Sequence, residues 1–109
     1  MLIILGSVIA REDSFAEVLR LSQEHVSRSL QEPGCLRHEV LPDPDNARRL
    51  VFVEQWATAD DLQRHFQVPA SIAFARSVAA LAADAPEMKI YEAREMAPPR
   101  PTAKPDGSS

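Results

Sequence analysis

The sequence contains one cysteine, Cys35, among 109 residues. A single cysteine cannot form a disulfide within the chain, so a reducing compartment, the cytoplasm, is expected. Basic residues are outnumbered by acidic ones, which gives a formal net charge of −4. The arginines are scattered among acids rather than gathered in a stripe. This pattern argues against nucleic acid or an anionic membrane as a partner.

Motifs that bind nucleotides, flavins or metals are also missing. The chain has no Gly-x-Gly-x-x-Gly, P-loop, Cys-x-x-Cys or His-Glu-x-x-His pattern. His25, His38 and His65 are dispersed and lack the spacing of metal ligands, so neither a metal nor another cofactor is expected. Residues 1–10 are apolar, but they are too few to span a bilayer and lack the basic start of a signal peptide.

The hydrophobic pattern predicts seven elements in the order β-α-β-β-α-α-β. The first helix begins between Arg11 and Ser14 and ends before Pro33-Gly34, with His25 at the border of its apolar stripe, a surface or edge position. This order is typical of the ferredoxin-like split β-α-β fold of the α+β class, a four-stranded antiparallel sheet with helices on one face. The remaining elements are strands over 2–10, 35–41, 50–56 and 88–96, and helices over 58–68 and 70–83.

The chain is expected to form one domain over residues 1–96, followed by a proline-rich extended or mobile tail over 97–109. The first and third strands are apolar on both faces. A chain this short has too few helices to cover both faces of the sheet, so one apolar face is left uncovered. A second copy of the chain is therefore expected on the other face, as a homodimer.

The turn formers in residues 42–49 predict a hairpin between the second and third strands. A symmetric hairpin places Arg37 opposite Glu54 and His38 opposite Val53. This register predicts a structural ion pair between Arg37 and Glu54 on otherwise apolar strands.

Residues 50–66 are the stretch where chemistry is easiest to imagine. A strand that ends at Trp56 is followed by a helix that begins at Thr58, with Asp61 placed for a capping box. Leu62, His65 and Phe66 share one face of that helix. An indole and an imidazole are thus expected beside the same apolar space.

The motif FVEQW, followed by a short helix with His65 and then Pro69, and preceded by EPGCLRHEV, resembles the antibiotic biosynthesis monooxygenase family. The likeness spans residues 1–96 and is greatest to small quinol monooxygenase-type members. It implies a dimeric α/β barrel that oxidises a quinol or polycyclic aromatic phenol with O₂ and no cofactor.

The same resemblance implies site residues. His65 matches a histidine of quinol-type members and would accept the substrate proton; Trp56 matches a tryptophan whose N–H holds a substrate oxygen; and Arg76 matches a pocket arginine of anthrone oxygenases. Leu62 and Phe52 stand where those oxygenases carry a tyrosine and an asparagine. This difference argues against the same substrate class as the anthrone oxygenases. The implied lining of the substrate pocket is Phe52, Leu62, Phe66, Phe74 and His38.

Each of these residues also has a purely structural interpretation. His65 and Trp56 can be core residues, Arg76 a surface residue, and His38 a packing or dimer-interface residue. The alternative function is a non-catalytic dimeric α/β barrel that binds a small apolar ligand or acts in a stress response. An enclosed cavity that reaches Trp56, His65 and Arg76 would favour the enzyme.

Overall fold

The computed structural model describes residues 1–101 and contains, within them, four strands and three helices. Their order matches the predicted β-α-β-β-α-α-β pattern. Pro69, expected to interrupt the chain, occupies the first turn of α3, where its missing N–H costs no hydrogen bond. The elements are β1 (Leu2–Ile9), α1 (Phe15–Ser29), β2 (Cys35–Asp43), β3 (Asn46–Trp56), α2 (Ala59–Gln67), α3 (Pro69–Leu81) and β4 (Glu87–Glu92).

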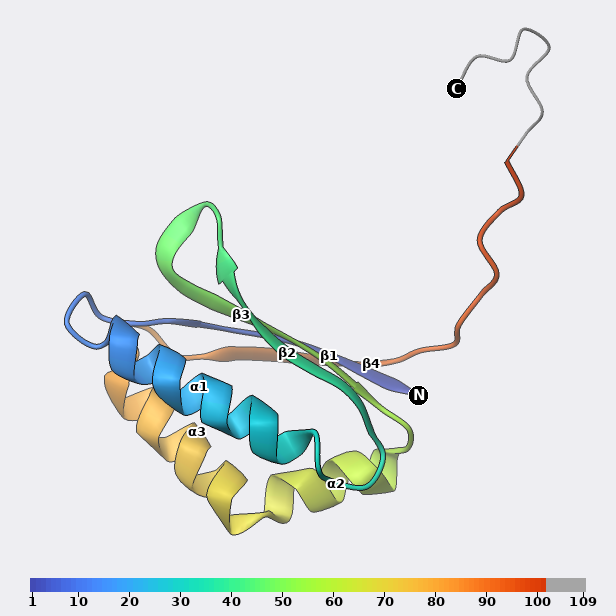
Figure 1. Cartoon of the computed structure of the whole chain (residues 1–109), viewed down its shortest axis with the longest axis horizontal. Helices are drawn as coiled ribbons and strands as arrows, with labels where there is room; N and C mark the ends of the chain where they lie inside the picture. The colour runs from blue at the N-terminus through green and yellow to red at the C-terminus, as the bar shows by residue number, and fades with distance from the viewer. Residues whose placement is uncertain (102–109) are drawn as a thin grey trace, which may run out of the picture.

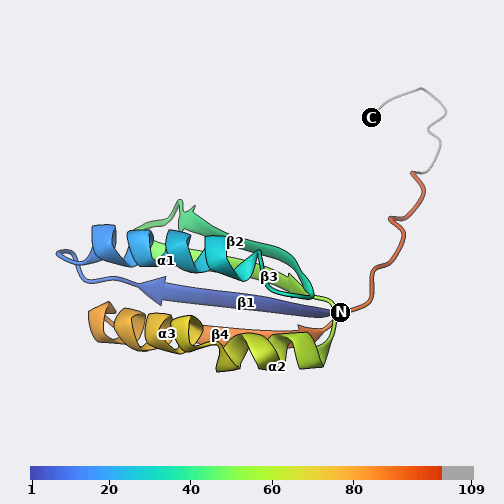
Figure 2. The same ribbon diagram turned by 60° about the horizontal axis from the view of Figure 1, so that its bottom comes forward.

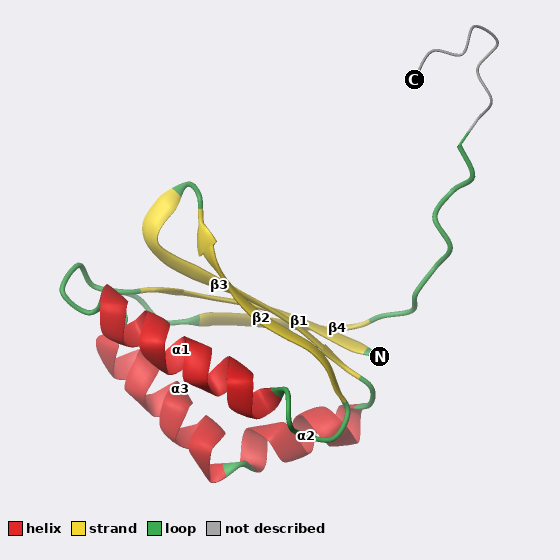
Figure 3. Ribbon diagram, viewed as in Figure 1, coloured by secondary structure: helices red, strands yellow, loops and turns green. Residues whose placement is uncertain are grey.

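The strands form one antiparallel sheet in the order β2-β3-β1-β4. All three helices lie on the same face of this sheet, with α1 and α3 side by side (Figures 1 and 2). Figure 3 shows the resulting two layers, helices on one side and strands on the other. The predicted ferredoxin-like α+β fold is confirmed. No helix in residues 1–101 is both long enough and apolar enough to span a membrane.

The hairpin of β2 and β3 contains a bulge that changes its predicted register. Cys35 and Arg37 lie opposite Trp56 and Gln55, respectively, so Leu36 is an extra residue on β2. From Arg37 to Pro42 each partner on β3 differs by one position from the predicted one, so the side chains of β2 exchange faces relative to the prediction. His38 consequently lies opposite Glu54 rather than Val53, on the face that the helices cover.

The predicted ion pair between Arg37 and Glu54 is therefore wrong. The bulge turns Arg37 to the exposed face, where its guanidinium binds both carboxylate oxygens of Glu39 at 2.9 Å. Glu54 is buried beneath the helices and contacts His38 and Trp56 instead.

Two apolar clusters join the helices to the sheet. The larger lies at the end where α1 begins and α3 ends, and the smaller lies beneath α2. The smaller consists of Ile4, Trp56 and Leu62, with Leu2 and Cys35 packed against it. The buried residues of the larger are Val8, Ala10, Val18, Leu50, Phe52 and Val78.

The loop that precedes β2 depends on Gly34. Its φ angle is +79°, in the left-handed region that favours glycine, and a Cβ atom there would overlap the Asp61 side chain. Asp61 is not free to move, because its backbone N–H donates to Thr58 Oγ1 at 3.1 Å and its carboxylate accepts from the same hydroxyl.

Gly34→Ala is expected to lower the free energy of unfolding by about 2–4 kcal/mol, measured by urea denaturation. Gly6→Ala is the comparison, because Gly6 has no positive φ and its Cβ would make only a tight contact with the Glu87 carbonyl oxygen, at 3.3 Å, so a smaller loss is expected. Equal losses at the two positions would contradict this account of Gly34.

The face of the sheet opposite the helices carries exposed apolar side chains. Because side chains alternate along a strand, this face contains the neighbours of the buried positions. Leu5, Leu41 and Tyr91 are 44%, 45% and 47% exposed, respectively. Residues 93–101 form no helix or strand and extend away from the sheet (Figure 1). Of the predicted tail, residues 102–109 lie outside the described part of the chain.

Candidate functional site

A cavity of about 330 Å³ lies between the sheet and helices α1, α2 and α3, bordered by the start of β4. Its walls are mostly apolar, and five of the residues that line it carry titratable groups: His25, Glu54, His65, Arg76 and Glu87. A space of this size accommodates a small aromatic molecule. The apolar lining includes Val8, Phe52, Phe66, Ile72, Phe74, Ala75, Val78 and Met88.

The cavity reaches some of the predicted pocket residues and not others. Phe52, Phe66 and Phe74 line it, as does Arg76. Leu62 is not part of the lining, because it packs against Ile4 and Trp56 in the smaller core cluster.

Trp56 is also outside the lining and is fully buried. Its indole N–H donates to Glu54 Oε1 at 3.0 Å, so this donor is already used within the protein. The rings of Trp56 and His65 are neighbours, with centroids 4.6 Å apart, but of the two only His65 lines the cavity.

His65 projects from α2 into the wall of the cavity and is only 3% exposed. Its Nδ1 lies 2.8 Å from a carboxylate oxygen of Glu32, in the loop between α1 and β2. A carboxylate in this position accepts a hydrogen bond from Nδ1–H, and in that tautomer the free lone pair of the ring is on Nε2. His65 therefore has the geometry of an oriented proton acceptor.

His25 is buried, so its predicted surface or edge position is wrong. Its ring stacks on Phe74 at a centroid distance of 4.0 Å. Burial, followed by the neighbouring His38 and His65, lowers the pKa of His25 from 6.5 to about 3. The imidazole of His25 is therefore neutral at physiological pH.

Glu54 lies at the floor of the cavity and is 6% exposed. Burial alone would raise its pKa, but the adjacent His38 and the N–H of Trp56 outweigh burial and hold the pKa of Glu54 below its ordinary value. His38 Nε2 lies 3.2 Å from Glu54 Oε1, although the two atoms lack the angles of a hydrogen bond. Glu54 is thus an ionised carboxylate beside a histidine.

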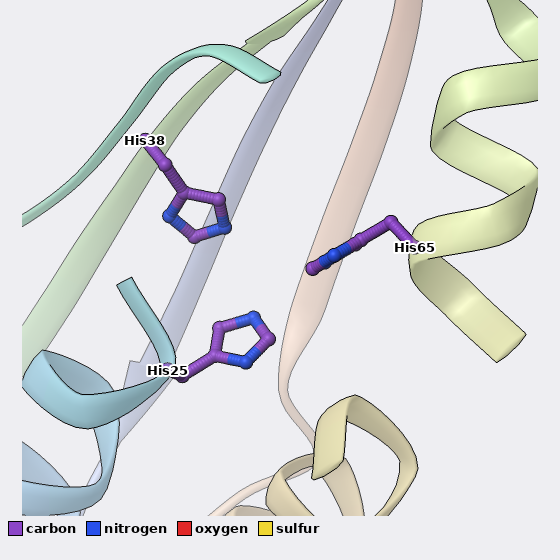
Figure 4. Close-up of side chains that lie close together, drawn as sticks. All are labelled: His25, His38 and His65. Carbon is purple, nitrogen blue, oxygen red and sulfur yellow. The ribbon is translucent and has the colours of Figure 1, made fainter. Parts of the chain in front are cut away.

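The three histidines, dispersed in the sequence, converge in space. His25 comes from α1, His38 from β2 and His65 from α2, and the rings point toward a common centre (Figure 4). One nitrogen of each lies within 4.8 Å of a nitrogen of the others. His38 does not line the predicted pocket but lies behind His25 and His65.

Two features of this site were not predicted from the sequence. Glu32 gave no signal, because it lies in a loop 33 residues from its partner His65. The burial of His25 had only a weak signal in the sequence. Ser22 and Ser29 lie three residues before and four residues after it, so these small residues share its buried helix face. A face of small polar residues and one histidine differs from an ordinary apolar stripe.

Comparison with known proteins gives the family. The model of the family described as antibiotic biosynthesis monooxygenase matches residues 1–77. The uncharacterized protein sll1783 of Synechocystis is 30% identical over 94 residues, which are 86% of this chain and 64% of that protein. The chain thus spans less than two thirds of the length of this curated relative.

Solved structures show the same fold. A Deinococcus radiodurans protein, provisionally named an antibiotic biosynthesis monooxygenase, matches with a TM-score of 0.85 at 22% identity, over 93% of this chain and 100% of that one. Rv0793 of Mycobacterium tuberculosis matches with a TM-score of 0.82 at 16% identity, over 89% of this chain and 98% of that one. Similarity at these identities concerns the fold alone. By the family match over residues 1–77, the chain belongs to the antibiotic biosynthesis monooxygenase family.

Proposed function

We propose that this protein is a monooxygenase that oxidises a quinol or a polycyclic aromatic phenol with O₂ in the cavity, without flavin or metal. The observation that carries the proposal is an apolar cavity with a buried His65 in its wall, oriented by the carboxylate of Glu32. Family membership supports the reaction class, since the family is named for monooxygenases.

The proposed reaction requires only groups that the site contains. His65 Nε2 takes the hydroxyl proton of the substrate, and the resulting anion gives one electron to O₂. The substrate radical and superoxide then combine into a peroxide at a ring carbon that bears a hydrogen. Protonated His65 returns its proton to this peroxide, and the resulting hydroperoxide loses water to leave a new carbonyl group. One oxygen atom of O₂ enters the product and the other leaves as water.

The anionic substrate needs a positive partner in the cavity. Arg76 lines the cavity from an exposed position on α3. Because a guanidinium offers several N–H donors to an anionic oxygen, we assign to it the stabilisation of the phenolate oxygen. Trp56 takes a supporting role in this proposal. Its N–H holds Glu54 rather than the substrate.

Oxygen uptake tests the proposal directly. Naphthoquinols and anthrones, in buffer with chelator and without flavin, are expected to show O₂ consumption above the uncatalysed rate.

Ala75→Trp should reduce turnover by about 10-fold or more, because Ala75 lines the cavity. Ala73→Trp is the matched control, because Ala73 also lies on α3 but is not part of the cavity lining. A folded protein that binds these compounds but consumes no O₂ would instead be the non-catalytic ligand-binding barrel.

We also propose that the protein is a homodimer whose subunits pack sheet against sheet in the cytoplasm. The exposed apolar face that contains Leu5, Leu41 and Tyr91 supports this assembly. Sedimentation at micromolar concentration is expected to show a dimer, with an interface on the order of 2,000 Å² in total. Leu5→Lys should shift the equilibrium toward monomers. A wild-type protein that sediments as a stable, folded monomer would overturn this assignment.

A further inference from the structure

Two of the three buried histidines have ring nitrogens without a hydrogen-bond partner among residues 1–101. These are Nδ1 of His25 and Nδ1 of His38, whereas Nε2 of His38 lies 3.2 Å from the Glu54 carboxylate without the angles of a hydrogen bond. Both side chains are at least nine-tenths buried, at 5% and 2% exposure. Buried polar atoms in native proteins nearly always have a partner, because leaving one unsatisfied costs free energy. These two rings are therefore poorly explained as ordinary core residues.

The arrangement of the rings indicates what partner suits them. Imidazole nitrogens from three different elements meet within 4.8 Å of one another around a common centre (Figure 4). Neutral imidazoles are preferred ligands of zinc, copper, iron and nickel. We propose that His25, His38 and His65 bind a divalent transition-metal ion, through one nitrogen each.

Two carboxylates complete the chemistry of such a site. The Glu32 carboxylate lies 2.8 Å from Nδ1 of His65. A carboxylate that accepts from the second ring nitrogen of a metal-binding histidine fixes its tautomer and orients its ring. Glu54 lies 3.2 Å from His38 Nε2 and contributes a negative charge beside the ion. Nitrogens in a tetrahedral zinc site are about 3.4 Å apart, given Zn–N bonds of about 2.0–2.1 Å. The ring nitrogens must therefore approach one another by up to about 1.4 Å, a movement within reach of side-chain rotation.

Metal binding has a consequence for catalysis, and this consequence rests on the proposed function. The Nε2 atom of His65 cannot accept a substrate proton while it binds an ion. Zn²⁺ at the three histidines should therefore suppress the O₂-dependent oxidation, and a chelator should restore it. The binding of the ion itself does not depend on the protein being an enzyme.

The test is a titration of the full chain, with no histidine tag, by Co²⁺ after removal of metals. The chain contains only three histidines, so histidine-dependent binding reports on this cluster alone. We expect about one Co²⁺ per chain, with the intense visible bands of tetrahedral coordination, displaced by Zn²⁺. His38→Gln should weaken binding by at least about 100-fold, and Glu32→Gln, which removes the carboxylate behind His65, by about 10-fold. Cys35→Ser is the matched control and should bind Co²⁺ as the wild type does.

A second measurement does not depend on whether the variants fold. Zn²⁺ added to the wild-type protein should shift the imidazole ¹⁵N resonances of all three histidines together. The metal site is overturned if folded wild-type protein binds no Co²⁺, if the imidazole resonances do not move, or if Cys35→Ser abolishes binding.

Oxidation in chelated buffer by a protein that binds no Co²⁺ would overturn the metal site alone. Co²⁺ binding by a protein that oxidises no quinol would overturn the proposed function alone. Faster turnover with Zn²⁺ would contradict the predicted suppression.

Discussion

Replacing His65 with alanine is expected to lower quinol turnover by about 100-fold or more at neutral pH. Formation of the substrate anion limits electron transfer to O₂, and His65 is the proton acceptor that a carboxylate orients, with Glu32 at 2.8 Å from its Nδ1. The loss should shrink at high pH, where the quinol ionises in water without help. Steady-state O₂ uptake across a pH series measures both effects.

Burial of His65 requires a control for folding, because truncation leaves a gap beside Trp56. His65→Gln keeps most of the volume but accepts no proton, so it should lose activity to a similar extent. Added imidazole should restore part of the turnover of His65→Ala by occupying the gap. Unchanged turnover at every pH in a folded His65→Gln protein would show that His65 is only a core residue.

Acid is expected to destabilise the metal-free protein by several kcal/mol between pH 6.5 and pH 3. The pKa of His25 is about 3 in the folded chain and 6.5 ordinarily, so between these values only the unfolded chain binds the proton. Unfolding therefore becomes more favourable as the pH falls through this window. Each pH unit is worth about 1.4 kcal/mol for one such group.

Urea denaturation in the presence of chelator, at pH 7, 6, 5 and 4, measures this dependence, and His25→Phe isolates the contribution of one residue. Phenylalanine preserves the stack on Phe74 but has no titrating group. The slope of unfolding free energy against pH should be clearly smaller in this variant. Glu54, whose pKa is lowered, adds acid sensitivity of the same sign in both proteins. Identical slopes for wild type and His25→Phe would contradict the assignment of a neutral, buried His25.

Elements of the fold that depend on local pattern could be predicted from the sequence. The order of strands and helices follows from apolar periodicity and from stops such as Pro33-Gly34, and the start of α2 follows from the Thr58 capping box. These signals lie within a few residues of the features they determine. The resemblance to the family likewise rested on short segments, FVEQW with the helix that carries His65, Pro69 after it and EPGCLRHEV before it.

Features that depend on long-range contacts could not be predicted. The bulge at Leu36 has no local signature, yet by one inserted residue it replaces Arg37 with His38 on the helix-covered face. The histidine cluster requires α1, β2 and α2 to be placed together, so spacing along the chain gave no indication of it. The expectation that the chain binds no metal was based on that spacing and stays untested.

Isotope labelling tests the central claim, that the histidine-bordered cavity performs a monooxygenation. Anthrone, whose reacting carbon bears hydrogen, is oxidised under ¹⁸O₂ in chelated, flavin-free buffer, and the anthraquinone is analysed by mass spectrometry. The account predicts one ¹⁸O atom in each product molecule for the wild type, and product formation reduced to the uncatalysed rate with His65→Gln. The account would be contradicted if the wild type incorporated no more ¹⁸O than the uncatalysed reaction does. It would also be contradicted if wild type and His65→Gln formed equal amounts of labelled product.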